Sequence, residues 1–327
     1  MRAIATFKGN GSGSGSQGLV RFLPFLILAA VAVVPLWSGP YVIHLAVLTC
    51  LNVLIVNGLS IIERSGQLSF GHSAFVAIGA YASVLSSSML GLGVVSSALV
   101  GVAAAAVFAL LLGSVILRLT GVYFVLVTFA FAELTRLVLL DWAGVTGGAN
   151  GISGIGPVEL LGFVFKTRVS FYWLALGVAV ASLLLMLYLY SRPMGQAMDA
   201  VRENPSLAES TGLSVYRLQL LAFVIGCALA GLGGVLMSRY IGYISPESFN
   251  LSISVSLITM LVIGGRRSKW GPLVGALILT PLPEFFRGAV QTQHIFYGAA
   301  LILILRFLPE GLAGLAARLR RLKKGEA

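Results

Sequence analysis

Residues 92–117 read LGVVSSALVGVAAAAVFALLLGSVIL, and none of these positions carries a charged side chain. A transmembrane helix needs about 20 mainly apolar residues to cross the roughly 30 Å hydrocarbon core of a bilayer, so this stretch is long enough to span it. The strands of a membrane β-barrel alternate over only about ten residues, which does not fit a continuous apolar run of this length. The stretch therefore predicts a membrane-spanning α-helix.

The same pattern extends through most of the chain. Of the 327 residues, 58% are hydrophobic and 10% are charged, whereas soluble domains carry about 25% charged residues. Charged residues, prolines and glycine-rich turns delimit ten apolar segments. These segments cover residues 22–37, 41–62, 68–90, 92–117, 121–140, 170–190, 218–238, 251–265, 271–287 and 294–308. We predict an all-α polytopic bundle of about ten transmembrane helices, which excludes a water-soluble globule.

The basic side chains predict how this bundle is oriented. All but five of the 22 Lys and Arg residues fall on one side if the N-terminus is cytoplasmic. Cytoplasmic loops of membrane proteins carry an excess of Lys and Arg, so both termini are predicted to be cytoplasmic. The five basic residues on the opposite side are Arg136, Lys166, Arg168, Arg239 and Arg287.

The chain divides into one membrane domain and two tails. Residues 1–20 include a Gly/Ser-rich run at 9–16 and are predicted to form a flexible N-terminal tail. Residues 21–310 form the transmembrane domain, with a long cytoplasmic connection at 191–217. Residues 311–327 form a basic cytoplasmic tail, and attraction to anionic membrane lipid explains its cluster from Arg318 to Lys324 without a nucleic-acid partner.

Two patterns inside the predicted spans are interpreted as packing features. In segment 121–140, Glu133 and Arg136 lie three residues apart and can form an ion pair on one helical face. An ionisable residue within a span is a functional hypothesis by default, but so close a partner favours a structural pair. In segment 218–238, small residues recur every four positions, so that a neighbouring helix can approach closely. They are Ala222, Gly226, Ala230, Gly234 and Ser238.

Two polar stretches are candidates for a solute path. Polar or irregular backbone at membrane depth survives only where protein or a water-filled cavity satisfies it. In transporters, a helix interrupted by glycine often presents its backbone groups to substrate. We expect the path to be lined by Gly66, Gln67, Ser69, Gly71 and His72, with Thr146, Gly147, Gly148 and Asn150 near its outer mouth. The alternative for the first stretch is an ordinary helix start in which a serine caps the helix and His72 bonds to a neighbouring helix.

The cytoplasmic connection reads SRPMGQAMDAVRENPSLAESTGLSVYR over residues 191–217. This loop resembles the cytoplasmic loop of LivM-type permease subunits of branched-chain amino acid ABC importers. The stretches at 66–75, 146–155 and 264–276 agree with the same family in order and spacing, and the resemblance spans residues 40–310. The sequence is therefore similar to a permease, and residues 21–310 are expected to be its permease domain.

The resemblance implies the function, the location and the partners. It implies transport of branched-chain or other small hydrophobic amino acids across a bacterial or archaeal inner membrane, with no cofactor and no metal. The implied partners are two ATP-binding cassette ATPase subunits, a second permease of the same class and an extracytoplasmic solute-binding protein. The chain has no Gly-rich phosphate loop that ends in Lys followed by Ser or Thr, so ATP hydrolysis is expected on the separate ATPase chains, and the chain itself is not an enzyme.

The loop is expected to dock on an ATPase through a short helix. A helix that starts near Gln196 should end before Pro205, because the residue before a proline disfavours helical dihedrals. Such a helix would have about two turns, near 12 Å in length. The residues expected to couple to the ATPase are Asp199, Arg202, Glu203, Asn204, Pro205, Ala208 and Gly212.

Three alternatives stay open at this point. Related permeases carry urea or short amides, and the sequence does not choose among these solutes. A secondary carrier is disfavoured because the spans hold almost no carboxylates besides Glu133. A rhomboid-like intramembrane protease would use Ser153 in the sequence 151–154, but it needs a histidine base, and the chain has only His44, His72 and His294.

Overall fold

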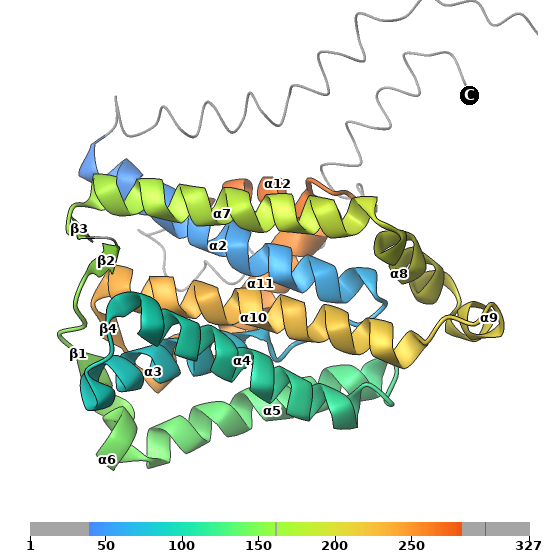
Figure 1. The fold of residues 1–327 in the computed structure, drawn as a ribbon, viewed down its shortest axis with the longest axis horizontal. Coiled ribbons are helices and arrows are strands. Elements are labelled where there is room, and N and C mark those ends of the chain that lie inside the picture. Colours follow the sequence, from blue (N-terminus) through green and yellow to red (C-terminus); the bar gives the residue numbers. More distant parts are fainter. Residues whose placement is uncertain (1–38, 161, 283–297, 299–327) are drawn as a thin grey trace, which may run out of the picture.

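The computed structural model describes residues 39–160, 162–282 and 298, and most of them belong to helices that run along a common direction (Figure 1). The long helices are α2 (Pro40–Arg64), α3 (His72–Leu90), α4 (Val94–Ile116), α5 (Val122–Asp141), α7 (Arg168–Ser191), α10 (Val215–Ile241) and α11 (Leu251–Gly264). The shorter helices are α6 (Ala143–Thr146), η1 (Gly148–Asn150), α8 (Pro193–Glu203), α9 (Pro205–Ser210), η2 (Pro246–Phe249) and α12 (Gly271–Leu279). The predicted helical bundle is confirmed.

Two small antiparallel sheets lie at one end of the bundle. One pairs β1 (Ile152–Ser153) with β4 (Tyr243–Ile244), and the other pairs β2 (Val158–Leu160) with β3 (Phe163–Phe165). The all-α prediction missed them because strands of two or three residues are too short to show an alternating pattern. We call this end, which also holds the N-termini of α2 and α7, the hairpin end; α8 and α9 mark the opposite end, the α8 end (Figure 1).

Seven helical stretches in the described residues are long and apolar enough to cross a membrane. They are α2, α3, α4, α5, α7, α10 and the stretch Pro246–Gly264. Each coincides with one of the ten predicted segments. The predicted segment 22–37, both tails and all of 294–308 except residue 298 lie outside the described residues, and 271–287 is described only as far as residue 282, with α12 in it. The described residues thus contain seven candidate spans, and ten remain a prediction.

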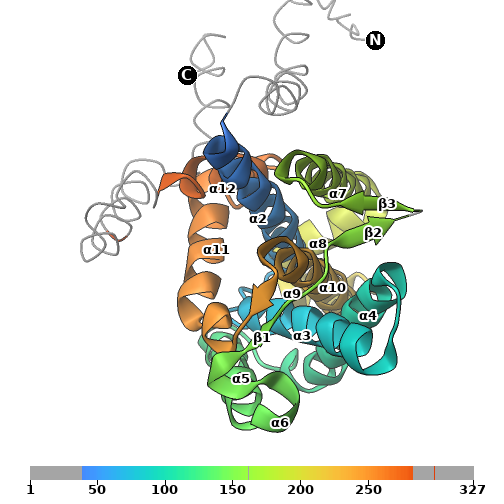
Figure 2. The same cartoon turned by 90° about the vertical axis from the view of Figure 1, so that its left-hand side faces the viewer.

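Helix α10 lies at the centre of the bundle when the helices are viewed end-on (Figure 2). Its predicted seam is buried along its whole length. The seam consists of Ala222, Gly226, Ala230, Gly234 and Ser238. A Cβ atom on Gly226 would lie 2.5 Å from the carbonyl oxygen of Gly58 in α2, and one on Gly234 would overlap the carbonyl of Val76 in α3. The backbones of three helices thus meet directly, which confirms the packing role expected of these small residues.

Candidate functional site

The polar stretch at 65–71 interrupts the helical path between α2 and α3. Residues 67–71 have no helical structure, and most of this stretch is buried in the bundle. Side chains of other helices satisfy its backbone: Gln219 of α10 donates to the carbonyl of Ser65 (3.2 Å), and the Phe70 amide donates to the hydroxyl of Thr128 in α5 (3.2 Å). The expected break is therefore present, and protein groups stabilise it, as backbone at membrane depth requires.

A buried polar cluster surrounds the start of α3. The Nε2 atom of His72 lies 3.2 Å from the carbonyl oxygen of Ile55 in α2, while its Nδ1 has no hydrogen-bond partner among the described residues. The hydroxyl of Ser254 in α11 donates to the hydroxyl of Ser73 (2.8 Å) and accepts from the Ser73 amide (3.1 Å). His72 is thus bonded to a neighbouring helix, as the ordinary helix start predicts, but the expected serine cap is wrong, because Gly71 precedes α3 and no side chain in the described residues caps it. The Nδ1 atom of His72 is buried.

The loop expected at the outer mouth is a tight turn after α5. The hydroxyl of Thr146 is buried and donates to the carbonyls of Leu139 (2.6 Å) and Trp142 (2.9 Å). Gly147 and Gly148 have φ angles of +76° and +55°, a left-handed backbone that favours glycine. These three residues therefore shape the turn.

The two parts of the expected solute path lie at different depths. Thr128 contacts residues 70 and 71 in the interior, whereas Thr146 and the exposed Asn150 follow the far end of α5. The helix from Thr128 to Asp141 is about 20 Å long at 1.5 Å per residue. The structure thus does not bring residues 66–72 and residues 146–150 into one cluster. If both belong to one path, residues 66–72 line its interior and residues 146–150 lie at its mouth.

Helix α8 projects from the end of α7 at the α8 end (Figure 1). It begins at Pro193, earlier than the expected start near Gln196, because proline suits the first position of a helix. Its 11 residues make it about 16 Å long, which corrects the expected 12 Å. It ends at Glu203, and Asn204 before Pro205 is extended, with φ −154° and ψ 100°, as the proline predicts.

An ion pair ties α8 to the end of α2. The guanidinium of Arg64 donates from Nε (2.8 Å) and Nη2 (2.5 Å) to the two carboxylate oxygens of Asp199. The same guanidinium lies over the ring of Tyr190 in α7, with its carbon 3.9 Å from the ring centre. The Tyr190 hydroxyl lies 3.0 Å from the hydroxyl of Ser60. Three helices are therefore joined through one arginine.

The neighbouring Glu63 joins a second set of cations. Its side chain is only 5% exposed, and Arg266, from the turn between α11 and α12, donates to it at 2.9 Å. Arg202 of α8 lies 3.6 Å from its other oxygen, and the backbone of Arg202 lies against Gly66. We call Glu63, Arg64, Tyr190, Asp199, Arg202 and Arg266 the clamp; a cavity of about 250 Å³ lies among its members.

The residues expected to couple to the ATPase fall into two groups. Asp199 and Arg202 face the bundle as members of the clamp, and Ala208 is buried in a small apolar cluster with Val201 and Val215. The others are exposed at the tip of the α8 end: Glu203, Asn204, Pro205 and Gly212. Charge reversal at Arg202 would thus disturb the helical bundle itself, so the exposed group is better suited to contact another chain.

Helix α5 carries the expected ion pair, with an additional partner. Arg136 donates from Nη2 to Glu133 (2.5 Å) and from Nη1 to Glu247 of η2 (2.6 Å). The predicted pair is confirmed, and the third member was not expected. Because Glu133 is 38% exposed on a helix that is otherwise apolar, this part of α5 is unsuited to face hydrocarbon.

Sequence reasoning missed Glu63, Tyr190, Arg266 and Glu247, which the fold brings to their partners from distant positions. One signal was available. Glu63 and Arg64 are adjacent charges that end the apolar segment 41–62, and an acid among so many basic residues predicts a partner. Ser153, the nucleophile of the protease alternative, is exposed on β1, where it pairs with Tyr243.

Together these features define a multi-pass membrane protein with an interrupted helix inside the bundle and a short helix clamped to one end. Residues 41–305 match the family described as branched-chain amino acid transport system / permease component, and the chain belongs to this family.

Named relatives agree with the family. The chain is 33% identical to the high-affinity branched-chain amino acid transport system permease protein LivM of Escherichia coli, over 94% of this chain and 77% of that protein. It is 30% identical to the permease protein LivH of Salmonella typhimurium, over 50% of this chain and 53% of that protein. A probable LivH of Methanocaldococcus jannaschii is 32% identical over 40% and 44%. No solved structure matches the chain.

Proposed function

We propose that this chain is a transmembrane subunit of an ABC importer that moves branched-chain amino acids into the cytoplasm, with ATP hydrolysis on partner chains. Membership of a family of transport permeases supports the transport function, and the names of the relatives support branched-chain amino acids as the solutes. The observation in the structure that supports a coupled mechanism is the clamped helix α8. It presents exposed residues beyond the bundle while its inner face is fixed to α2.

The inner side of the membrane would be the α8 end. Among the described residues, this end carries Arg118, Arg192, Arg217, Arg267 and Lys269 in addition to the basic members of the clamp. The excess of basic residues on cytoplasmic loops then orients the protein, so that α8 meets the ATPase and the hairpin end meets the solute-binding protein.

The clamp suggests how work reaches the solute path. Arg202 of α8 contacts Glu63, near the end of α2, and Gly66, in the turn directly before the non-helical residues 67–71. A movement of α8 would therefore displace residues 65–71 and, through them, the start of α3 at His72. Gly66, Gln67, Ser69, Gly71 and His72 would form the inner part of the path, where transporters bind solutes at interrupted helices.

The second permease would cover α4 and α5. These two helices expose the most apolar surface of the bundle, including Leu111, Val122 and Leu134. Lipid could cover that surface, but it would not tolerate the charged group of Glu133, Arg136 and Glu247. A second permease could hold these charges at a shared, hydrated boundary. Cysteines at Leu126 or Leu134 should cross-link to that subunit, whereas a cysteine at the exposed Leu184 of α7 should not.

Reconstituted vesicles test the function directly. The chain, its second permease, two ATPases and the binding protein should take up leucine, isoleucine and valine in the presence of ATP. Deletion of residues 199–207 should abolish uptake while the chain still inserts, and substitution of the exposed Ser210 by Ala should not. Uptake of urea or acetamide in preference to leucine would favour the alternative solutes. Uptake that survives the deletion would refute the coupling role of α8.

A further inference from the structure

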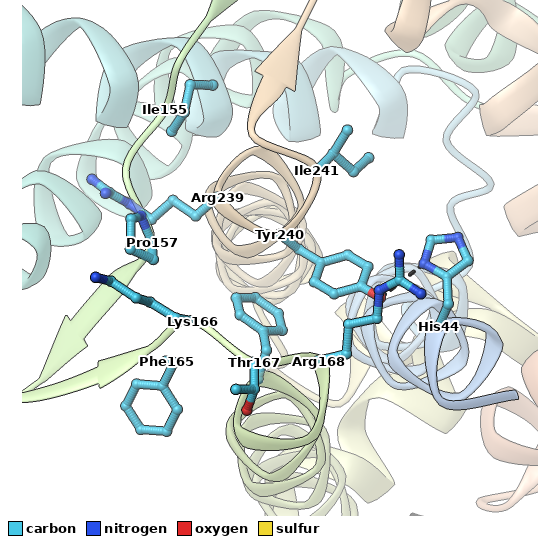
Figure 3. Close-up of a pocket in the computed structure, with 11 residues that line it drawn as sticks. His44, Ile155, Pro157, Phe165, Lys166, Thr167, Arg168, Arg239, Tyr240 and Ile241 are labelled. Atoms are coloured by element: carbon cyan, nitrogen blue, oxygen red, sulfur yellow. Dashed lines mark hydrogen bonds between the residues drawn. The ribbon is translucent and has the colours of Figure 1, made fainter. Parts of the chain in front are cut away.

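A cavity of about 600 Å³ opens at the hairpin end, between the N-terminus of α7 and the C-terminus of α10 (Figure 3). Three basic residues line it: Lys166 after β3, Arg168 at the start of α7 and Arg239 near the end of α10. No carboxylate is among the residues that line it. The cavity is therefore suited to an anionic group.

Arg239 is a buried cation without a counterion in the described part of the chain. Its exposed fraction is 6%, and none of the ion pairs in the described ranges includes it. Its Nη2 donates to the hydroxyl of Ser97 (2.6 Å) and its Nη1 to the carbonyl of Gly156 (3.4 Å). Its Nε has no hydrogen-bond partner in the same residues. A buried arginine of this kind is costly unless an anion approaches it, because neutral acceptors do not compensate its charge.

The other two cations are exposed at the mouth. Lys166 and Arg168 are solvent-exposed, and the described residues contain no ion pair for either. In Figure 3 the side chain of Arg168 extends toward His44 and Tyr240, while that of Lys166 extends to the other side of the cavity. The aromatic residues Phe165, Phe171 and Tyr240 also line the cavity. The cavity thus combines cations with apolar surface.

The cavity lies where three helices that are long and apolar enough to cross a membrane end, and such helix ends lie near the headgroups of a bilayer. Helix α2 begins at Pro40, α7 begins at Arg168 and α10 ends at Ile241, so three membrane-spanning helices reach their limits around it. Beside it, Phe163 at the tip of the β2–β3 hairpin is 76% exposed and Trp173 on α7 is 47% exposed. Exposed aromatic residues at the ends of spans mark the membrane–water interface.

We propose that this cavity binds the phosphodiester headgroup of an anionic phospholipid, with Arg239 at its base and with Lys166 and Arg168 at its mouth. Phe163 and Trp173 would lie in the adjoining layer of the same lipids. A zwitterionic amino acid fits less well, because its ammonium group would find no carboxylate in the wall. This site is separate from the solute path and does not depend on the proposed transport function.

The test measures lipid binding to the delipidated full-length chain in detergent by native mass spectrometry. Phosphatidylglycerol should bind more tightly than phosphatidylcholine with the same acyl chains, and added salt should weaken the preference. The double variant Lys166→Gln/Arg168→Gln should lose about tenfold in affinity for phosphatidylglycerol. The matched control Arg118→Gln/Arg217→Gln removes the same charge from the α8 end and should change it little.

Two further variants separate the parts of the site. Arg239→Gln should abolish the preference for the anionic lipid. Because Arg239 is buried, the Arg239→Gln variant could fail to fold; in that case the double variant Lys166→Gln/Arg168→Gln, whose residues are exposed, still tests the proposal. Phe163→Ser should weaken both lipids equally. Equal binding of phosphatidylglycerol by wild type and both cation variants would overturn the proposal. Displacement of the lipid by millimolar inorganic phosphate would also overturn it, because it would identify a site for a free anion. The same holds if the cation variants bind both lipids normally and lose only the binding of the solute-binding protein, which would identify a docking site.

Discussion

Arg64 and Asp199 lie 135 positions apart in the chain, and their side chains meet in a two-point ion pair that fixes α8 to the end of α2. Asp199 was expected to contact an ATPase, and its carboxylate is instead used within the chain. In the proposed mechanism the pair has a functional consequence, because α8 can transmit force to the bundle only while it is attached. The exposed part of α8 would receive the force from the ATPase, and the clamp would pass it to the bundle.

Asp199→Asn should uncouple α8 from α2. The side chain of Asp199 is 46% exposed, so the pair contributes only about 0.5–1 kcal/mol. That lowers the equilibrium constant for the attached position of α8 about two- to fivefold, so less leucine should be transported per ATP hydrolysed in reconstituted vesicles. Glu159→Gln, in β2 at the hairpin end, is the charge-matched control, because Glu159 is exposed, lies far from α8 and makes no ion pair in the described residues. An unchanged ratio of transport to hydrolysis in Asp199→Asn would show that the pair does not carry force.

Glu63→Gln should reduce stability more strongly than loss of the half-exposed Asp199. The carboxylate of Glu63 is nearly buried between Arg266 and Arg202, and a neutral amide would leave both cations poorly compensated. Because Arg266 is itself 46% exposed, we expect a cost of about 1–3 kcal/mol, below that of a fully buried pair. Thermal unfolding of the purified chain in detergent measures it, with Glu159→Gln again as the control. A melting temperature equal to that of the wild type would contradict a stabilising role for the clamp.

The sequence predicts the spans well and the clamp poorly, for a physical reason. A span is defined by its own residues, so an uncharged run such as 92–117 predicts α4 without knowledge of any neighbour. The break before Pro205 is equally local, because the proline acts on the residue directly before it. Local signals therefore gave the helices and the end of α8.

Contacts between distant segments could not be predicted in this way. Glu63 meets Arg266 across 203 positions, and Arg239 meets Ser97 across 142. Which basic residue approaches a given acid depends on the order in which the helices pack, and a single sequence does not contain that order. The charge count placed Arg239 on the outer side, but only the fold showed that it is buried and lines a cavity.

The contacts of α10 predict that it tolerates no larger residues on its seam. In Gly234→Val the added side chain would overlap the carbonyl of Val76, so α3 would have to move. Overpacking of this kind costs about 1–3 kcal/mol or prevents assembly. Gly177→Ala in α7 is the control, because no atom lies within 4 Å of its Cβ position and alanine favours the helix. The two variants should separate in the yield of folded protein and in thermal unfolding; equal yields would show that the seam is loosely packed.

The proposed orientation leads to a labelling experiment. Cysteines at Ser206, at the α8 end, and at Ala149, near the hairpin end, would both be exposed. The native Cys50 and Cys227 are buried, and their replacement by Ala gives a background without other thiols. In intact cells a membrane-impermeant maleimide should label the cysteine at position 149 and not that at 206, because the α8 end carries the excess of basic residues. Both should react after the membrane is permeabilised, which controls for accessibility. Labelling at 206 in intact cells would reverse the orientation and would place α8 on the side where no ATP is hydrolysed, so the proposed coupling could not operate.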